Sequence, residues 1–430
     1  MTKSSLNVRK KAVMQEIKNF YKGLPKNFYK NPNWIVPIGG GYYDEKEVIA
    51  TTTCYLDGLL STQRTVVEFE NHFSAYIGVK HGIAVNSGTS ANILAFDALI
   101  QSGALKKGDE VALPATTFIS VATPIVQLGL KPVYVDIDKA TLNMDMKALE
   151  NALKKSNKIK CVIIVHTLGC PADMTRLMNL KKKYSFKVIE DCCEAHGAKH
   201  HGKRVGSFGD IATWSFYVAH NMTTAEGGMI CTNSNELSVL LRDLREFGRD
   251  RTFKGKRYGY TGAGLKDFDE RYTFHKVGWN FRMADAPAAF GLEQLKKLEK
   301  MNGMRIKNAE YLHKKLSKFL SILILPPLAT KTMSHTYYTF PIVIKDKRIS
   351  RGEFARFLES KKIETRAIMC GTLSDQPALH KAGGREDDAL TNSRYVRDNG
   401  FSIGCHPLLS KSDLDHVVLS VTEFLTAYVK

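Results

Sequence analysis

Three short segments of the chain carry the residue types of a site that binds a phosphate and moves protons. The first, residues 86–91, reads Asn-Ser-Gly-Thr-Ser-Ala and lies between a predicted strand and a predicted helix. Free backbone N–H groups at a helix start, with a glycine that allows close approach, suit a phosphate group. Small polar residues before a helix are also common N-caps, so this segment alone does not establish such a site.

The second segment, residues 188–194, is an apolar run that ends in acidic residues. A carboxylate at the C-terminal end of a parallel strand lies in the crevice where α/β sheets bind ligands. Asp191 there is suited to pair with a protonated ring nitrogen of a cofactor. Glu190 is equally well explained as a solvated strand end.

The third segment contains His220, which follows a β-rich run at Ser215, Phe216 and Tyr217 and precedes the sequence Glu226-Gly227-Gly228. Histidine titrates near neutral pH and therefore suits general base catalysis. A lone histidine is more often structural than catalytic. The three segments together favour a catalytic role for His220.

The elements that must position these residues alternate in type from residue 82 to 233. Continuous apolar runs predict buried strands at residues 82–86, 110–114, 132–136, 161–166 and 188–191. Helical spacing occurs between them, at residues 91–100, 122–127, 146–154 and 174–184. This order predicts an α/β fold, with a mostly parallel sheet covered by helices on both faces.

The pattern changes after Gly228. Residues 236–247 are amphipathic, and residues 248–269 are predicted to run over the surface. A long helical region at 285–319, interrupted near Asn302-Gly303, precedes strands at 339–344 and 416–419 and a helix at 352–361. We therefore expect an N-terminal extension (residues 1–37), a large domain (38–304) and a smaller C-terminal α/β domain (305–430).

Length and composition are those of a globular protein of more than one domain. The 430 residues exceed the usual size of a single core. No apolar run is long enough to span a bilayer, and the lysine-rich start lacks the features of a secretory signal, which predicts a cytoplasmic protein without membrane association. The eight cysteines are scattered and form no C-x-x-C pair, so we predict no metal site.

The net charge is +19, from 62 basic and 43 acidic residues. The lysines are spread along the chain, and no nucleic-acid-binding module surrounds them. A solvated basic surface explains the charge better than a nucleic-acid partner does, and a basic cleft for a phosphate-bearing substrate remains compatible with it.

Ordered motifs extend these three segments across most of the chain. They are Ser-Gly-Thr-Ser-Ala-Asn (87–92), Pro-Ala-Thr-Thr-Phe (114–118), Glu-Asp-Cys-Cys-Glu-Ala-His-Gly-Ala (190–198), Gly-Ser-Phe-Gly-Asp-Ile-Ala-Thr-Trp-Ser-Phe (206–216), Glu-Gly-Gly-Met (226–229), Gly-Trp-Asn-Phe-Arg (278–282) and Glu-Thr-Arg (364–366). Together, over roughly residues 40–425, they resemble the DegT/DnrJ/EryC1/StrS sugar aminotransferase family. The resemblance implies the type I fold of pyridoxal-phosphate (PLP)-dependent aspartate aminotransferases.

Within that family the chain resembles the branch in which histidine replaces the lysine that anchors PLP, the nucleotide-diphosphate 4-keto-6-deoxyhexose 3-dehydratases. The resemblance implies roles for particular residues. The cofactor phosphate would be held by Gly88, Thr89, Ser90 and Ser215; Phe118 would stack on the pyridine ring, Asp191 would pair with its nitrogen and Glu194 would lie near its 3-hydroxyl. Asn280 would reach the cofactor phosphate of a neighbouring subunit, which implies a homodimer with shared active sites. Arg366, His335 and Tyr338 are candidate substrate contacts, although packing or surface roles explain the last two nearly as well.

The replacement of lysine by His220 fits a dehydratase. A lysine would hold the aldehyde form of the cofactor covalently and protonate intermediates towards an amino sugar, whereas histidine supports proton removal alone. The resemblance thus implies a lyase that binds PLP or pyridoxamine phosphate (PMP) non-covalently. It would remove the C3 hydroxyl of a nucleotide-linked 4-keto-6-deoxyhexose, in the biosynthesis of 3,6-dideoxysugars such as those of lipopolysaccharide O-antigens.

Two types of such dehydratases differ in how they are supplied with electrons. One couples to a reductase through a [2Fe–2S] cluster on four cysteines, and the other uses L-glutamate. When the cysteine spacing of the iron–sulfur type is counted from Cys193, the other three cluster positions fall on Arg251, Phe253 and Thr261, none of which is a cysteine. A cluster needs four good ligands, so the sequence predicts the glutamate-dependent, cluster-free type.

Other interpretations remain open at this point. They are a reductase-coupled 3-dehydrase of the iron–sulfur type, a non-catalytic homologue that binds PLP or a sugar nucleotide, and an aminotransferase that uses Lys199 or Lys203. The sequence does not determine the nucleotide, the hexose or the role of residues 1–37.

Overall fold

A mostly parallel eight-stranded sheet forms the centre of the protein. The computed structural model describes residues 3–25, 28–249 and 264–428. The strand order is β1-β9-β8-β5-β4-β2-β3-β14. The strands are β1 (His81–Val85), β2 (Glu110–Pro114), β3 (Lys131–Val135), β4 (Ile159–Val165), β5 (Lys187–Asp191), β8 (Ile211–Ser215), β9 (Gly228–Thr232) and β14 (Arg385–Glu386). Only β9 runs antiparallel to its neighbours, β1 and β8, so the predicted fold class is confirmed.

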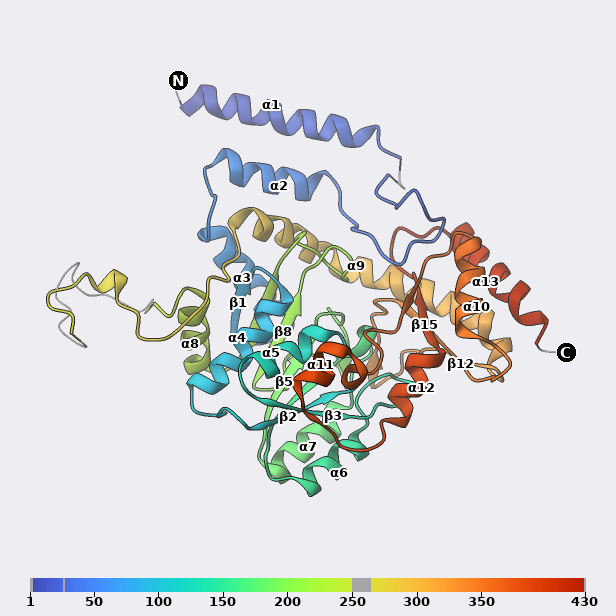
Figure 1. Ribbon diagram of the computed structural model, residues 1–430. Coiled ribbons are helices and arrows are strands. Elements are labelled where there is room, and N and C mark those ends of the chain that lie inside the picture. Colours follow the sequence, from blue (N-terminus) through green and yellow to red (C-terminus); the bar gives the residue numbers. More distant parts are fainter. Residues whose placement is uncertain (1–2, 26–27, 250–263, 429–430) are drawn as a thin grey trace.

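Helices cover both faces of this sheet (Figure 1). Alternate residues of a strand point to opposite faces. In β4, Ile163 packs with the helices of one face and Ile164 with those of the other. The first face carries α4 (Gly88–Gln101), α5 (Thr123–Gln127) and α8 (Asn235–Arg245); the second carries α6 (Met146–Lys155), α7 (Met174–Tyr184), α3 (Arg64–Ile77) and α9 (Asp285–Leu316). The parallel strands buried on both sides explain the continuous apolar runs in the sequence.

A second, antiparallel sheet of order β10-β12-β15-β13 forms a separate hydrophobic core with the end of α9. Its strands are β10 (Leu323–Ile324), β12 (Phe340–Ile344), β13 (Thr365–Ala367) and β15 (Gly400–Ile403), and α10 (Arg351–Ser360) and α13 (Lys411–Thr426) pack on it. The remaining strands, β6 (Lys199–His200), β7 (Lys203–Arg204) and β11 (Met333–Ser334), form a small third sheet. The other helices are α1 (Lys3–Lys22), α2 (Glu45–Leu56), α11 (Pro377–Ala382) and α12 (Thr391–Asn399), and 3-10 turns lie at Ile119–Val121, Thr167–Gly169, Glu270–Tyr272, Ser317–Phe319 and Leu373–Asp375.

The predicted boundary between two domains falls inside α9, which belongs to both cores. Val36 of the N-terminal extension also packs in the second core, and β14 of the C-terminal part pairs with β3 of the large sheet. The domain limits therefore stay a prediction.

The predicted interruption near Asn302-Gly303 is wrong, because α9 is continuous there. Asn302 is buried, and its amide donates to the carbonyl of His196 and accepts from the Asn221 side chain. These tertiary contacts outweigh the low helix propensity of Asn and Gly.

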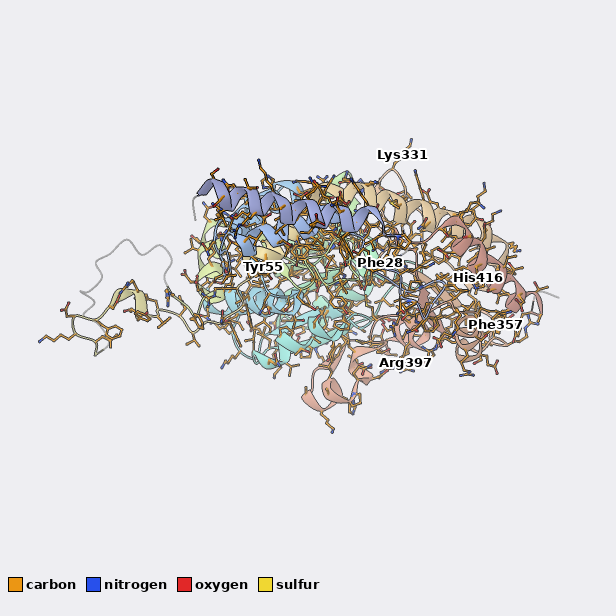
Figure 2. All side chains as sticks on the ribbon, turned by 90° about the horizontal axis from the view of Figure 1, so that it is seen from above. Phe28, Tyr55, Lys331, Phe357, Arg397 and His416 are labelled. Carbon is orange, nitrogen blue, oxygen red and sulfur yellow. The ribbon has the colours of Figure 1, made fainter. Side chains whose placement is uncertain are left out.

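The predicted strand at 416–419 is also wrong, because these residues lie within α13. Ser410 and Asp413 form a capping box that starts the helix, and Leu414, Val417 and Val421 are buried at helical spacing. Figure 2 shows His416 and Phe357 of α10 at the same end of the molecule. The β-branched run at 416–419 is compatible with either element, because a short apolar segment does not by itself distinguish a strand from a helix.

The N-terminal extension includes α1, which lies alongside α2 (Figure 1). Lys10 of α1 pairs with Asp57, and Lys30 pairs with Asp413 at 2.8 Å. Of the helices in the described residues, none has both the length and the apolar character needed to cross a membrane.

Candidate active site

A cavity of about 350 Å³ opens at the C-terminal ends of β4, β5 and β8. The strand register places Val165 of β4 opposite Asp191 of β5, so these ends meet at one edge of the sheet. This is the edge where open α/β sheets bind ligands. The predicted site residues that line the cavity are Gly88, Thr89, Phe118, Asp191, Glu194, Ser215, His220 and Tyr338.

The start of α4 forms one wall of the cavity. Ser87 caps the helix and accepts a hydrogen bond from the Ser90 amide at 3.1 Å. Gly88 is in close contact with the end of β8, since a Cβ there would lie 2.5 Å from the Cβ of Ser215. The amides of the first helical turn have no partner within a helix, so Gly88, Thr89 and Ser215 form a cradle for an anion. Ser90 is buried and bonds to Ser87 without lining the cavity.

Asp191, at the end of β5, is a buried carboxylate held by neutral donors. Its Oδ2 accepts from the Asn92 side chain at 3.0 Å, and its Oδ1 accepts from the Cys193 amide at 3.1 Å. Asn92 is fixed in turn by the hydroxyl of Thr213, which donates to its Oδ1 at 2.7 Å. Among the described residues no cation pairs with Asp191, so its charge is available to a bound group.

His220 lies in the loop that follows β8 and is half-buried. The N–H of His220 donates to the Tyr217 carbonyl, and the carbonyl of His220 accepts a hydrogen bond from Arg305. Its Nδ1 is buried without a hydrogen-bond partner in the described structure. Burial, with the nearby charge of Arg305, lowers the pKa of His220 to about 3. The imidazole is therefore uncharged at pH 7.

Glu194 and Tyr338 flank this histidine. Glu194 accepts a hydrogen bond from the Leu168 amide at 2.8 Å, and the ring of Tyr338 lies 5.2 Å from that of His220. Burial raises the pKa of Glu194 to about 8, and the charge of Asp191 adds to this effect. Burial also raises the pKa of Tyr338. Both groups are protonated at pH 7 and can donate hydrogen bonds.

Besides Ser90, three predicted residues lie away from the cavity lining. Asn280 is exposed and accepts from Arg282 at 3.1 Å, and Arg366 is exposed and pairs with Glu364 at 2.6 Å. His335 is buried and stacked on Tyr337, with 3.7 Å between ring centroids. His335 is packed in the interior, and its role as a substrate contact, like the roles of Asn280 and Arg366, stays a prediction.

The cavity lining also includes residues to which the sequence assigned no role, among them Thr117, Tyr217, Glu226 and Met369. Tyr217 and Glu226 lie near His220 in the sequence, and this proximity could have identified them. Met369 comes from the C-terminal part of the chain, and Asn92 supports Asp191 from inside α4. No local sequence pattern identifies these two residues.

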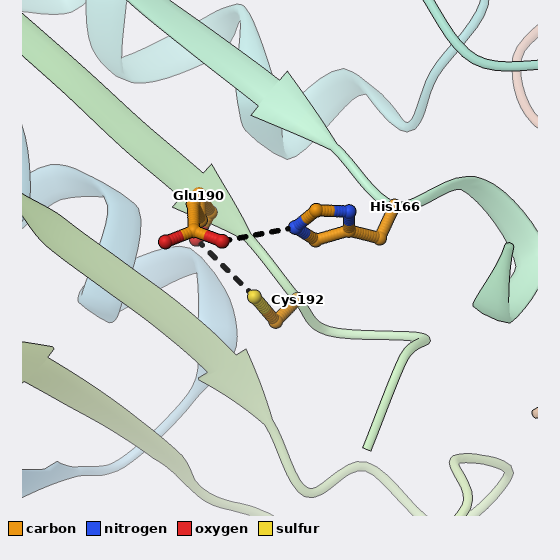
Figure 3. A group of neighbouring side chains, drawn as sticks. All are labelled: His166, Glu190 and Cys192. Atoms are coloured by element: carbon orange, nitrogen blue, oxygen red, sulfur yellow. Dashed lines mark hydrogen bonds and ion pairs between the residues drawn. The ribbon is translucent and has the colours of Figure 1, made fainter. Parts of the chain in front are cut away.

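Behind the cavity lies a cluster formed by His166, Glu190 and Cys192 (Figure 3). Their ligand-type atoms lie within 4.8 Å of one another. Both oxygens of Glu190 are already engaged: they accept from His166 at 3.2 Å and from the amides of Gly206, Phe208 and Gly209 at 2.6–2.8 Å. Despite burial, these hydrogen bonds hold the pKa of Glu190 below its usual range. Glu190 is therefore not a solvated strand end but a buried anchor for the turn at 206–209.

The residues that line the cavity are relevant to two alternatives, an aminotransferase that uses another lysine and an iron–sulfur enzyme. None of the described residues that line the cavity is a lysine, and Lys199 and Lys203 lie on β6 and β7. Cys193 lines the cavity, whereas positions 251, 253 and 261 lie outside the described residues.

Comparisons with known proteins agree with this architecture. Residues 42–422 match the model of the DegT/DnrJ/EryC1/StrS aminotransferase family. The chain is 37% identical to the lipopolysaccharide biosynthesis protein RfbH of Salmonella typhimurium, covering 93% of this chain and 94% of that protein. It is 30% identical to the GDP-4-keto-6-deoxy-D-mannose 3-dehydratase of Yersinia pseudotuberculosis, covering 86% and 94%.

Solved structures show the same fold. The Escherichia coli GDP-4-keto-6-deoxy-D-mannose-3-dehydratase with bound hydrated PLP has a TM-score of 0.82 and 29% identity, covering 90% of this chain and 98% of that one. A GDP-4-keto-6-deoxymannose-3-dehydratase with a trapped PLP-glutamate geminal diamine has a TM-score of 0.81 and 29% identity, covering 90% and 99%. The predicted relationship is confirmed: the chain belongs to the DegT/DnrJ/EryC1/StrS aminotransferase family.

Proposed function

We propose that this protein is a PLP/PMP-dependent 3-dehydratase of a nucleotide-linked 4-keto-6-deoxyhexose, with L-glutamate as amino donor and without an iron–sulfur cluster. The observation that carries the proposal is the neutral His220 in a cavity whose described lining contains no lysine. The 3-dehydratases among the relatives and neighbouring structures support it.

The cavity residues fit the cofactor. Gly88, Thr89 and Ser215 would hold its phosphate, because the cradle at the start of α4 offers amides and a hydroxyl. Asp191 would face the ring nitrogen, since a buried carboxylate without a described cationic partner favours a protonated pyridine. The ring of Phe118 is 55% exposed and lines the cavity, so a bound pyridine would cover it.

The side chains divide the proton chemistry among them. When bound, the pyridoxamine form supplies an amine for the C4 ketone of the sugar and an electron sink that lets the C3 hydroxyl leave. His220 is neutral and able to take up a proton in this cavity. Glu194 and Tyr338 are protonated and able to donate hydrogen bonds to oxygens of the cofactor or the sugar.

The glutamate half of the proposal rests on two observations. Only one cysteine, Cys193, stands at the four positions that a cluster would use, and a neighbouring 3-dehydratase structure contains a PLP-glutamate adduct. We also propose a homodimer in which Asn280, exposed and outside the cavity of its own chain, contacts the cofactor phosphate of the second subunit.

The test supplies PLP and L-glutamate to the purified protein, follows the conversion of the aldehyde absorbance, and then adds a panel of nucleotide-linked 4-keto-6-deoxyhexoses. Mass spectrometry should show a sugar that has lost one oxygen and gained no nitrogen. An amino sugar as main product would overturn the dehydratase assignment, and an unchanged aldehyde absorbance would overturn the glutamate half.

His220→Lys provides a further control, because a lysine amine can bind the aldehyde. This variant should acquire an adduct that borohydride reduction fixes to the protein, whereas the wild type should show none. A reducible adduct in the wild type would instead favour an aminotransferase that uses another lysine.

A further inference from the structure

Arg305 is a buried arginine that contacts the loop of His220. It lies in the middle of α9 and is 2% exposed. Its Nη1 donates to the Tyr338 carbonyl at 2.9 Å, and its Nη2 donates to the His220 carbonyl at 3.4 Å. One guanidinium thus joins two segments far apart in sequence, each of which sends a ring into the cavity.

The charge of Arg305 is unusual because no described carboxylate forms an ion pair with it. Its acceptors are backbone carbonyls, and its Nε has no hydrogen-bond partner in the described structure. By contrast, the equally buried Arg245 pairs with Glu70 at 2.6 Å. Burying an unpaired charge is costly, so folding alone does not explain why a cation stands at this position.

Asn302, one turn before Arg305 on α9, also contacts segments that surround His220. Asn302 donates to the carbonyl of His196 at 2.7 Å and accepts from Asn221, the neighbour of His220, at 3.0 Å. The ring of His196 lies 6.1 Å from that of His220. The backbone that carries the imidazole therefore has a fixed place relative to the guanidinium.

We propose that Arg305 is a positioning residue for His220: it holds the His220 loop against the Tyr338 segment and places an unpaired positive charge near the imidazole. This inference rests on the proposed function, in which His220 must be neutral to accept a proton. The titratable and charged groups around the ring are Arg305 from α9, His196 from the loop after β5, Tyr217 from its own loop and Tyr338, with Asp191, Glu194 and Glu226 also lining the cavity. Burial of the ring disfavours a charged imidazole, and the positive charge of Arg305 acts in the same direction.

Two substitutions separate the charge of Arg305 from its hydrogen bonds. Arg305→Gln removes the charge and keeps one donor for a carbonyl, whereas Arg305→Lys loses the planar fork but is positively charged at the acidic pH where His220 titrates. NMR of protein with isotopically labelled histidine follows the protonation of His220 directly, and the His220 signal is identified by its loss in His220→Asn. This measurement does not require dehydratase activity.

We expect the wild-type His220 signal to stay constant from pH 8 down to pH 5. In Arg305→Gln the midpoint should rise by about one to two pH units, from about 3 to about 4–5, so that the signal begins to move between about pH 6 and pH 5. Arg305→Lys should titrate like the wild type. Arg245→Met, which removes a buried but paired guanidinium, should leave the His220 titration unchanged.

An unchanged midpoint in Arg305→Gln, or equal shifts in Arg305→Gln and Arg305→Lys, would overturn the inference. If Arg305→Gln does not fold, a raised midpoint in Arg305→Lys overturns it, because the lysine retains the charge. A protein that shows the expected shifts but dehydrates no sugar would refute the proposed function and leave the role of Arg305 intact.

Discussion

Replacement of Gly88 by alanine is the most direct test of the cofactor cradle. The added Cβ would lie 2.5 Å from the Cβ of Ser215, 3.1 Å from its Oγ and 3.2 Å from the Sγ of Cys193. Non-bonded carbon atoms prefer a separation of about 3.5–4.0 Å. The start of α4 and the end of β8 must therefore separate by about 1 Å or more.

This displacement has two measurable consequences. Overpacking of this kind costs about 1–3 kcal/mol of folding free energy. The cofactor phosphate would also lose at least one hydrogen bond of a charged group, worth about 1.5–3 kcal/mol. Since about 1.4 kcal/mol corresponds to a factor of ten, the Kd for PLP should rise about ten- to a hundredfold.

Two other glycines provide matched controls. Gly303, inside α9, has no atom within 4 Å of a built Cβ, so Gly303→Ala should keep the wild-type Kd and gain up to about 1 kcal/mol of stability. Gly78, which ends α3 with a φ of 88°, is outside the cavity lining, so Gly78→Ala should lower stability without changing the Kd.

The assay is a PLP titration followed by absorbance, combined with thermal unfolding of the apoprotein. A Gly88→Ala protein that binds PLP with the wild-type Kd would refute the assignment of this cradle to the phosphate. An equal loss of affinity in Gly78→Ala would show that general destabilisation, and not the cradle, controls binding.

Three further predictions concern protonation and buried polar groups. His220→Asn should keep the Kd for PLP but lower the rate of sugar dehydration about a hundred- to ten-thousandfold, the usual contribution of a general base; unchanged turnover would show that His220 is incidental. Burial lowers the pKa of His335 to about 3, below the value of about 6.5 in the unfolded chain. Between these two pH values the unfolded state binds more protons than the folded state. The free energy of unfolding therefore falls as the pH drops below about 6.5. In urea unfolding, the free energy of unfolding of His335→Gln should therefore fall by about 1.6 kcal/mol less than that of the wild type between pH 6.5 and pH 5. Equal decreases would contradict this assignment. Glu190→Gln should lower the free energy of unfolding by about 3–5 kcal/mol because it breaks a buried charged network. A chelator should leave the melting temperature of the wild type unchanged. A chelator-induced drop would point to a metal at His166, Glu190 and Cys192.

The sequence by itself determined the parallel core and much of the cavity. The strands at 110–114 and 188–191 were predictable because residues buried on both faces of a parallel sheet leave continuous apolar runs. The helix at 174–184 was predictable from its helical spacing of apolar residues. Asp191 was predictable because it ends a buried strand, and Gly88 because it stands at a helix start, whereas Ser215 followed from the family resemblance.

Only the tertiary structure decided the features that depend on contacts between distant segments. It made α9 continuous through Asn302, because the amide of that residue is satisfied by His196 and Asn221. It placed His335 in a packed stack on Tyr337, and it set Arg305 against the loop of His220 without a described acidic partner. Local patterns report which residues are buried, but the partners of a buried polar group, and hence its charge state, depend on the segments that folding brings beside it.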